Sequence, residues 1–408
     1  MISTAHYTYP LTEERIARFP LPQRDQSRLL IYDRGSIREQ KFRDLPSALP
    51  ERAWLAFNKT RVIQARLHFH KHSGARIEIF CLEPVDPPGY ELAYRSEGNS
   101  IWRCLVGNAR KWKEGTLSMQ VNIGGKAVEL MAEKVGDGDG EFTINFRWEV
   151  PGITFGDLLE RAGQTPIPPY LNREAEESDR ERYQTVYSKE PGSVAAPTAG
   201  LHFTGDLMEQ LRKRGNRISH ITLHVGTGTF VPVKTADARD HPMHRELVVV
   251  EKEFLNEWAH LPEKLLAVGT TTTRSLESLY WLGVKILAGE DPDPHELQLR
   301  QWENEQLPQN YSLSESLQAL VSYCDDRGLR QLTYSTGLMI VPGYRFRTIN
   351  GLITNFHMPG STLLMLIAAF IGDDWRKVYE YALTNGFRFL SYGDSSLLLP
   401  GPLQQERR

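Results

Sequence analysis

Hydrophobic and polar residues follow one pattern towards the two ends of the chain and a different one in between. Near the N-terminus, residues 29–32 and 54–57 form apolar runs with the length of short buried strands. In the second half, the apolar run 265–269 comes just before residues with helical spacing, and the run 351–356 comes just before an apolar helix at 361–372. Two strand–loop–helix units predict a sheet flanked by helices, with ligands bound beyond the carboxyl ends of the strands.

Between about residues 66 and 148, apolar and polar side chains alternate with a period of two. Residues 76–80, 90–94 and 141–146 show this alternation, and turns that contain glycine separate the runs. Short strands at this spacing are typical of an antiparallel barrel or sandwich.

Together the two patterns predict an α/β fold, with a mixed sheet flanked by helices and an inserted antiparallel β-barrel domain. We expect the barrel domain to comprise residues 67–149 and the α/β domain, with most candidate site residues, to comprise residues 1–66 and 150–408. The polar stretch 285–330 is interpreted as an insertion or a partly flexible excursion, and the sequence assigns it no role.

Composition and charge narrow the class of protein. Of the 408 residues, 40% are hydrophobic and 24% are charged, with a net charge of -3, as in a globular protein that is not strongly basic. An RNA partner would therefore need a local basic patch. The three cysteines, Cys81, Cys104 and Cys324, form no CxxC pair, so we expect neither disulfides nor zinc. Without a visible signal peptide or membrane-spanning run, the chain is expected to be cytoplasmic.

The densest group of candidate site residues lies in GSVAAPTAGLHF, residues 192–203. Small residues, a proline and two glycines give a tight backbone path that a bulky ligand can approach closely. Thr198, Gly200 and His202 lie at the end of this path. The alternative is a packed turn with a structural histidine.

A second segment, ITLHVGTGTF, covers residues 221–230. Its alternation predicts a strand up to His224, after which Gly226 and Gly228 expose backbone N–H groups. The segment lacks the third glycine of a dinucleotide-binding fingerprint and the lysine of a P-loop. A strand kinked by glycine explains it equally well.

A third segment, HPMHRE, places His241, His244 and Glu246 within six residues. The spacing fits neither HExxH nor a structural zinc site, so no metal is expected. Acid–base chemistry or hydrogen bonding to a ligand is favoured, and a solvated polar loop is the alternative.

The remaining candidates lie where a predicted strand ends or a predicted helix begins. At a helix start, free N–H groups together with an arginine can hold a carboxylate or a phosphate. Singly, each such residue is more often structural than catalytic. These candidates are Asn58, Arg61, Thr271, Arg274, Asn355, His357 and Asp394.

The segments occur in the same order as the motifs of a known enzyme family. From about residue 7 to residue 395, the chain resembles the S-adenosylmethionine:tRNA ribosyltransferase-isomerase family of queuosine biosynthesis. The segments that carry the resemblance are LPQRDQSRLL (21–30), NKTRVIQARL (58–67), YQTVYSKEPGSVAAPTAGLHF (183–203), TLHVGTGTFVPV (222–233), HPMHRE (241–246), AVGTTTTRSLES (267–278), VPGYRFRTINGLITNFHMPGSTLL (341–364) and RFLSYGD (388–394).

The resemblance implies a fold and a reaction. The fold is an α/β domain with an inserted β-barrel. The reaction transfers the ribosyl part of S-adenosylmethionine to 7-aminomethyl-7-deazaguanine at the wobble position of tRNA. The ribose is isomerised to give epoxyqueuosine, while adenine and methionine leave. S-adenosylmethionine is then the ribosyl donor and tRNA the partner, without a metal or a membrane, and the protein is expected to be a monomer.

This reaction needs a base near the 5′ carbon next to the sulfonium and an acid at the leaving adenine, and histidine suits both tasks. The candidates are His202, His224, His244 and His357, with Glu246 as a carboxylate partner, and which histidine does which stays open. A guanidinium can hold the methionine carboxylate or a tRNA phosphate, and Asp394 can pair with an ammonium. The expected binding residues are Asn58, Arg61, Thr198, Gly200, Gly226, Gly228, Thr271, Arg274, Asn355 and Asp394.

The chain also departs from the family pattern. Gln64 stands where proline is usual, and Ser395 and Ser396 follow Asp394 in place of Ala-Met. Two alternatives therefore stay open: a diverged paralogue that uses S-adenosylmethionine with another acceptor, and a non-catalytic tRNA-binding protein. A basic patch beside the site would favour RNA, and its candidate residues are Arg103, Arg110, Lys111 and Lys113.

Overall fold

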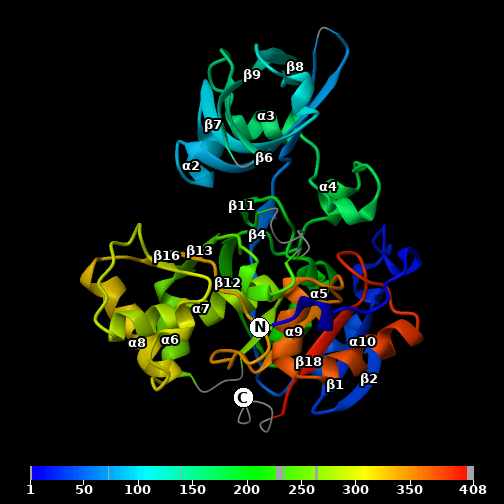
Figure 1. Cartoon of the computed structure of the whole chain (residues 1–408), viewed down its shortest axis with the longest axis vertical. Coiled ribbons are helices and arrows are strands. Elements are labelled where there is room, and N and C mark those ends of the chain that lie inside the picture. The colour runs from blue at the N-terminus through cyan, green and yellow to red at the C-terminus, as the bar shows by residue number, and fades with distance from the viewer. Residues whose placement is uncertain are drawn as a thin grey trace.

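The computed structural model describes residues 2–71, 73–138, 140–226, 233, 235–261 and 265–401. A large α/β body and a smaller β-barrel lie at opposite ends of the long axis of the molecule (Figure 1). The predicted fold class, a mixed sheet flanked by helices with an antiparallel barrel, is confirmed.

The described part of the α/β body contains a ten-stranded mixed sheet. The central strands β12, β3, β14 and β17 run parallel to one another, so their carboxyl ends lie along one edge, which we call the carboxyl edge. The strands in order across the sheet are β15 (Gln298–Leu299), β16 (Gln331–Thr336), β13 (Glu246–Glu251), β12 (Arg217–His224), β3 (Trp54–Asn58), β14 (Leu265–Val268), β17 (Gly351–Asn355), β18 (Ser395–Leu399), β1 (Arg28–Asp33) and β2 (Ser36–Lys41).

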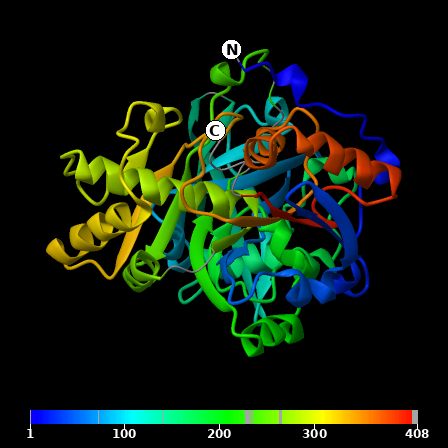
Figure 2. The ribbon, with the colours of Figure 1, turned by 90° about the horizontal axis from the view of Figure 1, so that it is seen from below.

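Alternate side chains of the buried strands enter two different cores. In β3, for example, Trp54 and Ala56 face one core, whereas Leu55 and Phe57 face the other. Helices α6 to α10 cover the first face, α1 and α5 cover the second, and Figure 2 shows helices on both sides of the sheet. The helices are α1 (Leu45–Ala48), α2 (Tyr90–Arg95), α3 (Phe155–Ala162), α4 (Asp179–Arg182), α5 (Gly205–Lys213), α6 (Lys252–His260), α7 (Thr270–Leu287), α8 (Leu313–Asp326), α9 (Thr362–Ile371) and α10 (Asp374–Thr384).

The second sheet is the barrel, whose described strands are all antiparallel to their neighbours. Its hydrophobic core also takes Phe155, Leu158 and Leu159 from α3, beyond the predicted end of the insertion at residue 149. The division of the chain into two domains stays a prediction. The strands in order are β5 (Arg66–His70), β6 (Arg76–Asp86), β7 (Asn99–Gly107), β10 (Glu141–Arg147), β9 (Lys126–Gly138) and β8 (Leu117–Ile123), and a separate parallel pair joins β4 (Thr60–Val62) to β11 (Glu190–Ser193).

Two local predictions are wrong. The alternating residues 90–94, predicted as a strand, form α2, because Tyr90 and Ala93 are buried with helical spacing and the Tyr94 ring packs against Gly156 of α3. The stretch 285–330, interpreted as partly flexible, contains the regular helix α8. A capping box of Ser312 and Glu315 starts this helix, and its apolar face packs into the main core.

The three cysteines are buried and carry free thiols. Among the described residues, no helix combines the length and the apolar character that a membrane crossing requires.

Candidate functional site

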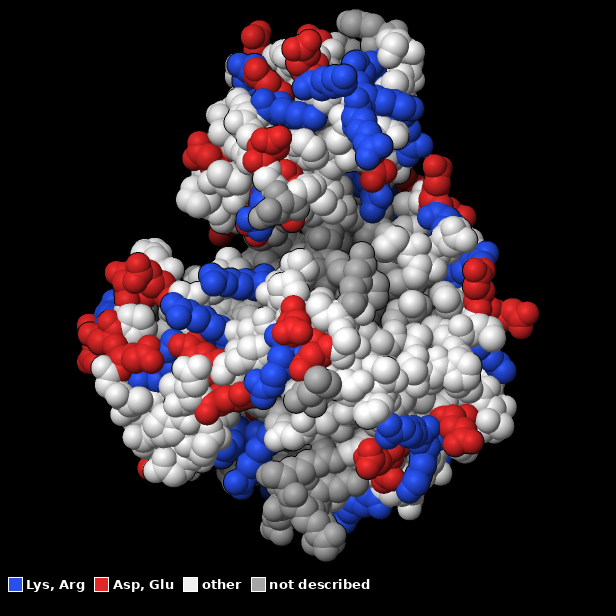
Figure 3. All heavy atoms as spheres, in the orientation of Figure 1, with Lys and Arg blue, Asp and Glu red and all other residues white. Residues whose placement is uncertain are grey.

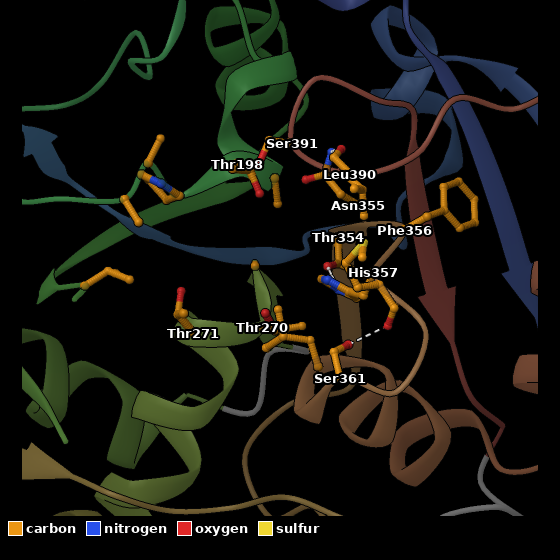
Figure 4. Close-up of a pocket in the computed structure, with 18 of the residues that line it drawn as sticks. Thr198, Thr270, Thr271, Thr354, Asn355, Phe356, His357, Ser361, Leu390 and Ser391 are labelled. Atoms are coloured by element: carbon orange, nitrogen blue, oxygen red, sulfur yellow. Dashed lines mark hydrogen bonds between the residues drawn. The ribbon is translucent and has the colours of Figure 1, made fainter. Parts of the chain in front are cut away.

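A cavity of about 260 Å³ lies at the carboxyl edge, beyond the ends of β14 and β17 (Figure 4). Figure 4 shows Thr270 and Thr271 on one side of it and His357 and Ser361 on the other. A mainly apolar wall with a few polar groups is typical of sites for small organic ligands. The wall is formed by residues 169–170, 195–199, 269–271, 354–358 and 390–391, with Val225, Ser361 and Leu363.

Of the four candidate histidines, only His357 lines this cavity. Its loop is held in place, because the His357 N–H donates to the Tyr379 hydroxyl at 3.1 Å and the Tyr9 hydroxyl donates to the His357 carbonyl. Nε2 lies 2.9 Å from the Thr354 hydroxyl, and Nδ1 has no hydrogen-bond partner in the part of the chain that is described. Burial lowers the pKa of His357 to about 3, so the ring is neutral at physiological pH.

Asn355, the last residue of β17, is held by its side-chain amide. Nδ2 donates to His202 Nε2 at 3.1 Å, to the Leu390 carbonyl at 3.2 Å and to the Asp394 carbonyl at 3.5 Å. Three acceptors around Nδ2 fix the orientation of the amide. Among the described residues its buried Oδ1 has no hydrogen-bond partner, which leaves one acceptor in the wall of the site.

His202 lies behind Asn355 and does not line the cavity. Because Nε2 accepts from Asn355, the proton is on Nδ1, which lies 2.8 Å from the Ser27 hydroxyl. Burial lowers the pKa of His202 to about 3, and the charge of Arg388 acts in the same direction. Both ring nitrogens are therefore occupied in a neutral ring.

The β14 side of the cavity is the start of α7. Gly269 turns the chain with a φ of +98°, and no side chain within the described ranges caps the first N–H groups of the helix. The hydroxyls of Thr272 and Thr273 bond back to the carbonyls of Val268 and Gly269 at 2.8 and 3.2 Å. Thr270 and Thr271 are therefore the members of the threonine cluster that line the cavity.

One turn further along α7, Arg274 forms a buried ion pair with Glu246 of β13. Nη1 lies 3.0 Å from Oε2, and Nε donates to the Leu338 carbonyl at 3.0 Å. The remaining nitrogen, Nη2, is buried and has no hydrogen-bond partner in the ranges that the structure describes. The pair belongs to the interior next to the site and not to the cavity wall.

The segment before His202 forms a wall of the cavity through Thr198 and its small neighbours. Gly200 is required by packing, because a Cβ there would lie 1.9 Å from the Tyr187 hydroxyl.

His224 lies at the end of β12, where the barrel touches the α/β body. Its ring stacks on Tyr90 of α2 with a centroid distance of 4.6 Å, and its Nδ1 donates to the Gly192 carbonyl at 2.7 Å. Burial lowers the pKa of His224, and the Gly192 carbonyl acts in the opposite direction. Gly192 has a φ of +130°, and a Cβ there would lie 2.6 Å from His224 Nδ1. The tight backbone path predicted at Gly192 is thus covered by the rings of His224 and Tyr90.

Comparison with known proteins assigns the family. The family described as "Queuosine biosynthesis protein" matches residues 4–398. The chain belongs to the queuosine biosynthesis protein family.

Relatives in this family carry a common name. A protein from Trichlorobacter lovleyi named S-adenosylmethionine:tRNA ribosyltransferase-isomerase is 37% identical over 400 residues, 96% of this chain and 98% of the relative. A protein of the same name from Syntrophomonas wolfei is 38% identical over 399 residues, 96% of each chain. A solved S-adenosylmethionine tRNA ribosyltransferase from Thermotoga maritima is 28% identical, with 96% of this chain and 99% of that chain covered and a TM-score of 0.44.

Two other predicted site residues form hydrogen bonds from their side chains to the backbone. The Asn58 side chain bonds both N–H and carbonyl of Leu223 at 3.2 Å and so ties β3 to β12. Asp394 accepts from the backbone N–H groups of Arg28 and Arg388, each at 2.8 Å.

The remaining predicted residues lie further from the cavity wall. Arg61 is half exposed, 3.6 Å from Glu160, and His244 is exposed. Gly226 directly follows the lining residue Val225, and Gly228 lies outside the described residues. No group of three or more His, Cys, Asp or Glu side chains in the described ranges is arranged to hold a metal ion.

Sequence reasoning missed Tyr170, which lines the cavity and shares a short hydrogen bond with the Ser391 hydroxyl. Burial raises the pKa of Tyr170, so its hydroxyl stays protonated and can donate. The signal was a tyrosine directly after Pro168 and Pro169, where the fixed φ of proline starts the short 3-10 helix Pro169–Leu171.

Proposed function

We propose that this protein transfers the ribosyl group of S-adenosylmethionine to 7-aminomethyl-7-deazaguanine in tRNA and isomerises it, giving epoxyqueuosine, adenine and methionine. The observation that carries the proposal is the match of nearly the whole chain to relatives named for this activity, at 37 and 38% identity. The geometry supports it, because segments far apart in the sequence, such as 195–199, 269–271 and 354–358, meet around one cavity.

S-adenosylmethionine fits the proposed site through both of its ends. The carbon-rich wall, to which Ala195 and Leu390 belong, suits the flat adenine ring, and the Asn355 Oδ1, which has no partner among the described residues, can accept from an N–H group. The uncapped start of α7, with Thr271 beside it, suits the methionine carboxylate, because helix N-termini favour anions.

His357 is the proposed base. It lines the cavity with a neutral ring, and its Nδ1 has no partner among the described residues, so it can accept the proton that leaves the 5′ carbon next to the sulfonium. The leaving adenine needs a proton in turn. The same imidazole, once protonated, can supply it.

A tRNA partner requires cations on the surface, although the net charge of the chain is -3. Figure 3 shows a group of Lys and Arg side chains on the barrel. Lys71 and Lys111 lie together there, since the Lys71 ammonium donates to the Lys111 carbonyl at 2.8 Å. Arg103, a predicted contributor, instead forms ion pairs with Glu83 and Glu141. We propose that the barrel contacts the tRNA backbone through Lys71 and Lys111.

Adenine release tests the proposed function. The protein is mixed with S-adenosylmethionine and tRNA that carries the aminomethyl-deazaguanine, and adenine is measured by chromatography while the digested RNA is analysed for epoxyqueuosine. The same tRNA with an unmodified guanine is the control substrate. Adenine and epoxyqueuosine with the modified tRNA alone are the expected result. S-adenosylmethionine binding without adenine release would contradict the proposal and point to a different acceptor.

A further inference from the structure

Three arginines converge on a small hollow next to the cavity. The hollow, of about 20 Å³, is lined by Arg24, Arg182 and Arg388, with His202 at its base, and it shares Ser391 with the main cavity. The three arginines come from η3 (Arg24–Gln26), from the end of α4 and from the segment before β18. Figure 1 shows α4 beside the N-terminal segment, drawn in blue, and the C-terminal segment, drawn in red.

Backbone carbonyls hold the three guanidinium groups in place. Each group donates to a carbonyl on another part of the site, which leaves the remaining N–H groups available. The bonds join Arg24 to Gln184 at 2.9 Å, Arg182 to Pro22 at 3.1 Å and also to Leu21, and Arg388 to Tyr392 at 3.0 Å and to Phe19 at 3.4 Å. Nε of Arg182 is buried and finds no hydrogen-bond partner in the described chain.

None of the three arginines has a carboxylate within ion-pair distance in the described part of the chain. The acids of the neighbourhood are engaged elsewhere: Asp179 pairs with Arg173 at 2.7 Å, and Glu160 lies 3.5 Å from Arg180. Glu181 attracts Arg24 from further away. Burial and the charge of Arg182 both lower the pKa of Arg24, which shows that the like charges act on each other.

Like charges held together with no described carboxylate at ion-pair distance cost free energy in the empty protein, and an anion at their centre would reverse this cost. We propose that Arg24, Arg182 and Arg388 form a subsite for a phosphate group of the RNA backbone next to the target nucleotide. The subsite rests on the proposed function in so far as the RNA is the substrate of the neighbouring cavity.

A phosphate fits this place better than the carboxylate of S-adenosylmethionine. The start of α7 already offers a place for that carboxylate. The hollow, in contrast, is too small to enclose a ligand, and Arg24 also lines a wider depression of about 500 Å³ through which a polymer can approach. Guanidinium groups that converge from separate segments match the several oxygens of one phosphate.

The test uses the full chain and an anticodon stem-loop RNA with an unmodified guanine at the wobble position, so that binding is measured without turnover. Arg24→Gln is compared with Arg214→Gln, which removes the same charge from an exposed residue after α5, at the opposite edge of the sheet. RNA affinity is measured by fluorescence anisotropy at several salt concentrations, and S-adenosylmethionine affinity by calorimetry. Arg24→Lys and thermal unfolding check that the fold is kept.

We expect Arg24→Gln to weaken RNA binding about tenfold and to make the plot of log affinity against log salt less steep by about 1. Arg24→Lys should keep the salt slope, and Arg214→Gln should match the wild type. S-adenosylmethionine affinity should not change in any variant.

Weaker S-adenosylmethionine binding with unchanged RNA binding would overturn the proposal and assign the cluster to the methionine carboxylate. Unchanged binding of both substrates would overturn it as well and make the cluster structural. A third outcome separates the two proposals. If Arg24→Gln loses RNA binding and the wild-type protein releases no adenine, the phosphate subsite is kept and the proposed function is rejected.

Discussion

The two strands that end at the cavity, β14 and β17, are followed by helices that begin in different ways. α7 starts directly after Gly269, and no described side chain caps its first N–H groups. α9 starts after a loop that holds His357, and the Ser361 hydroxyl accepts from the Leu364 N–H at 3.2 Å. The β14 end thus offers free backbone N–H groups, whereas the β17 end uses its N–H groups internally and offers an imidazole.

The ionisable groups near the two strand ends differ as well. Behind the β14 end, Arg274 and Glu246 neutralise each other in the interior. Behind the β17 end, His202 and His357 are neutral because burial lowers the pKa of each to about 3. We infer that the β14 end binds the carboxylate of S-adenosylmethionine and that the β17 end moves a proton. The following variants test this division.

The largest effect is expected at His357. His357→Ala should lower the rate of adenine release by about 100-fold to 10,000-fold, which is the usual contribution of a positioned base. Thr271→Ala on the β14 side should mainly raise KM for S-adenosylmethionine. Steady-state kinetics with both variants, and with His295→Ala at an exposed position as control, distinguish the two sides. A rise in KM alone for His357→Ala would contradict the proposal that His357 is the base.

Breaking the buried ion pair should give the next largest effect, on stability. Arg274→Met leaves Glu246 in the interior without its guanidinium, and such a change costs about 3–5 kcal/mol. Urea unfolding measures it. The double variant Arg274→Met/Glu246→Leu should recover much of the loss, because no charge is then left behind. A single variant as stable as the wild type would show that the pair does not support this end of the sheet.

The sequence predicted the parts of the fold in which local pattern and burial agree. The apolar runs that became β1, β3, β14 and β17 are buried on both faces, so their composition alone identifies them. Residues 90–94 misled because five residues can satisfy a period of two and a helical spacing at once. The stretch 285–330 misled because its polar loops hide the apolar stripe of α8.

The candidate site was predicted where it follows strand ends, as at Thr271, Asn355 and His357. The partners of these residues could not be predicted, because contacts such as that of His202 with Asn355 join segments 153 residues apart. For the same reason the arginine cluster was missed, since Arg24, Arg182 and Arg388 meet only in the folded chain.

The neutral histidines of the β17 end also predict a pH effect. The pKa of His202 is about 3 in the folded protein, below the ordinary value of 6.5, so the unfolded state binds more protons between these values. Stability is therefore full above pH 6.5 and is lost as the pH falls towards 3. His202→Gln should reduce the slope of unfolding free energy against pH by about 1.4 kcal/mol per pH unit between pH 4 and 6. His295→Gln should retain the wild-type slope, and an unchanged slope in His202→Gln would show that His202 is protonated in the fold.

The smallest effect concerns the helix starts themselves. Ser361→Ala removes the only side-chain acceptor at the start of α9 that the described residues provide, and it should cost about 1 kcal/mol. At the β14 end no cap exists to be removed, and a ligand carboxylate is proposed to take its place. S-adenosylmethionine should therefore raise the unfolding temperature of Ser361→Ala and of the wild type by the same amount, while Thr271→Ala should show a smaller rise. A smaller rise in Ser361→Ala, and a full one in Thr271→Ala, would place the carboxylate at the β17 end and reverse the division between the two strand ends.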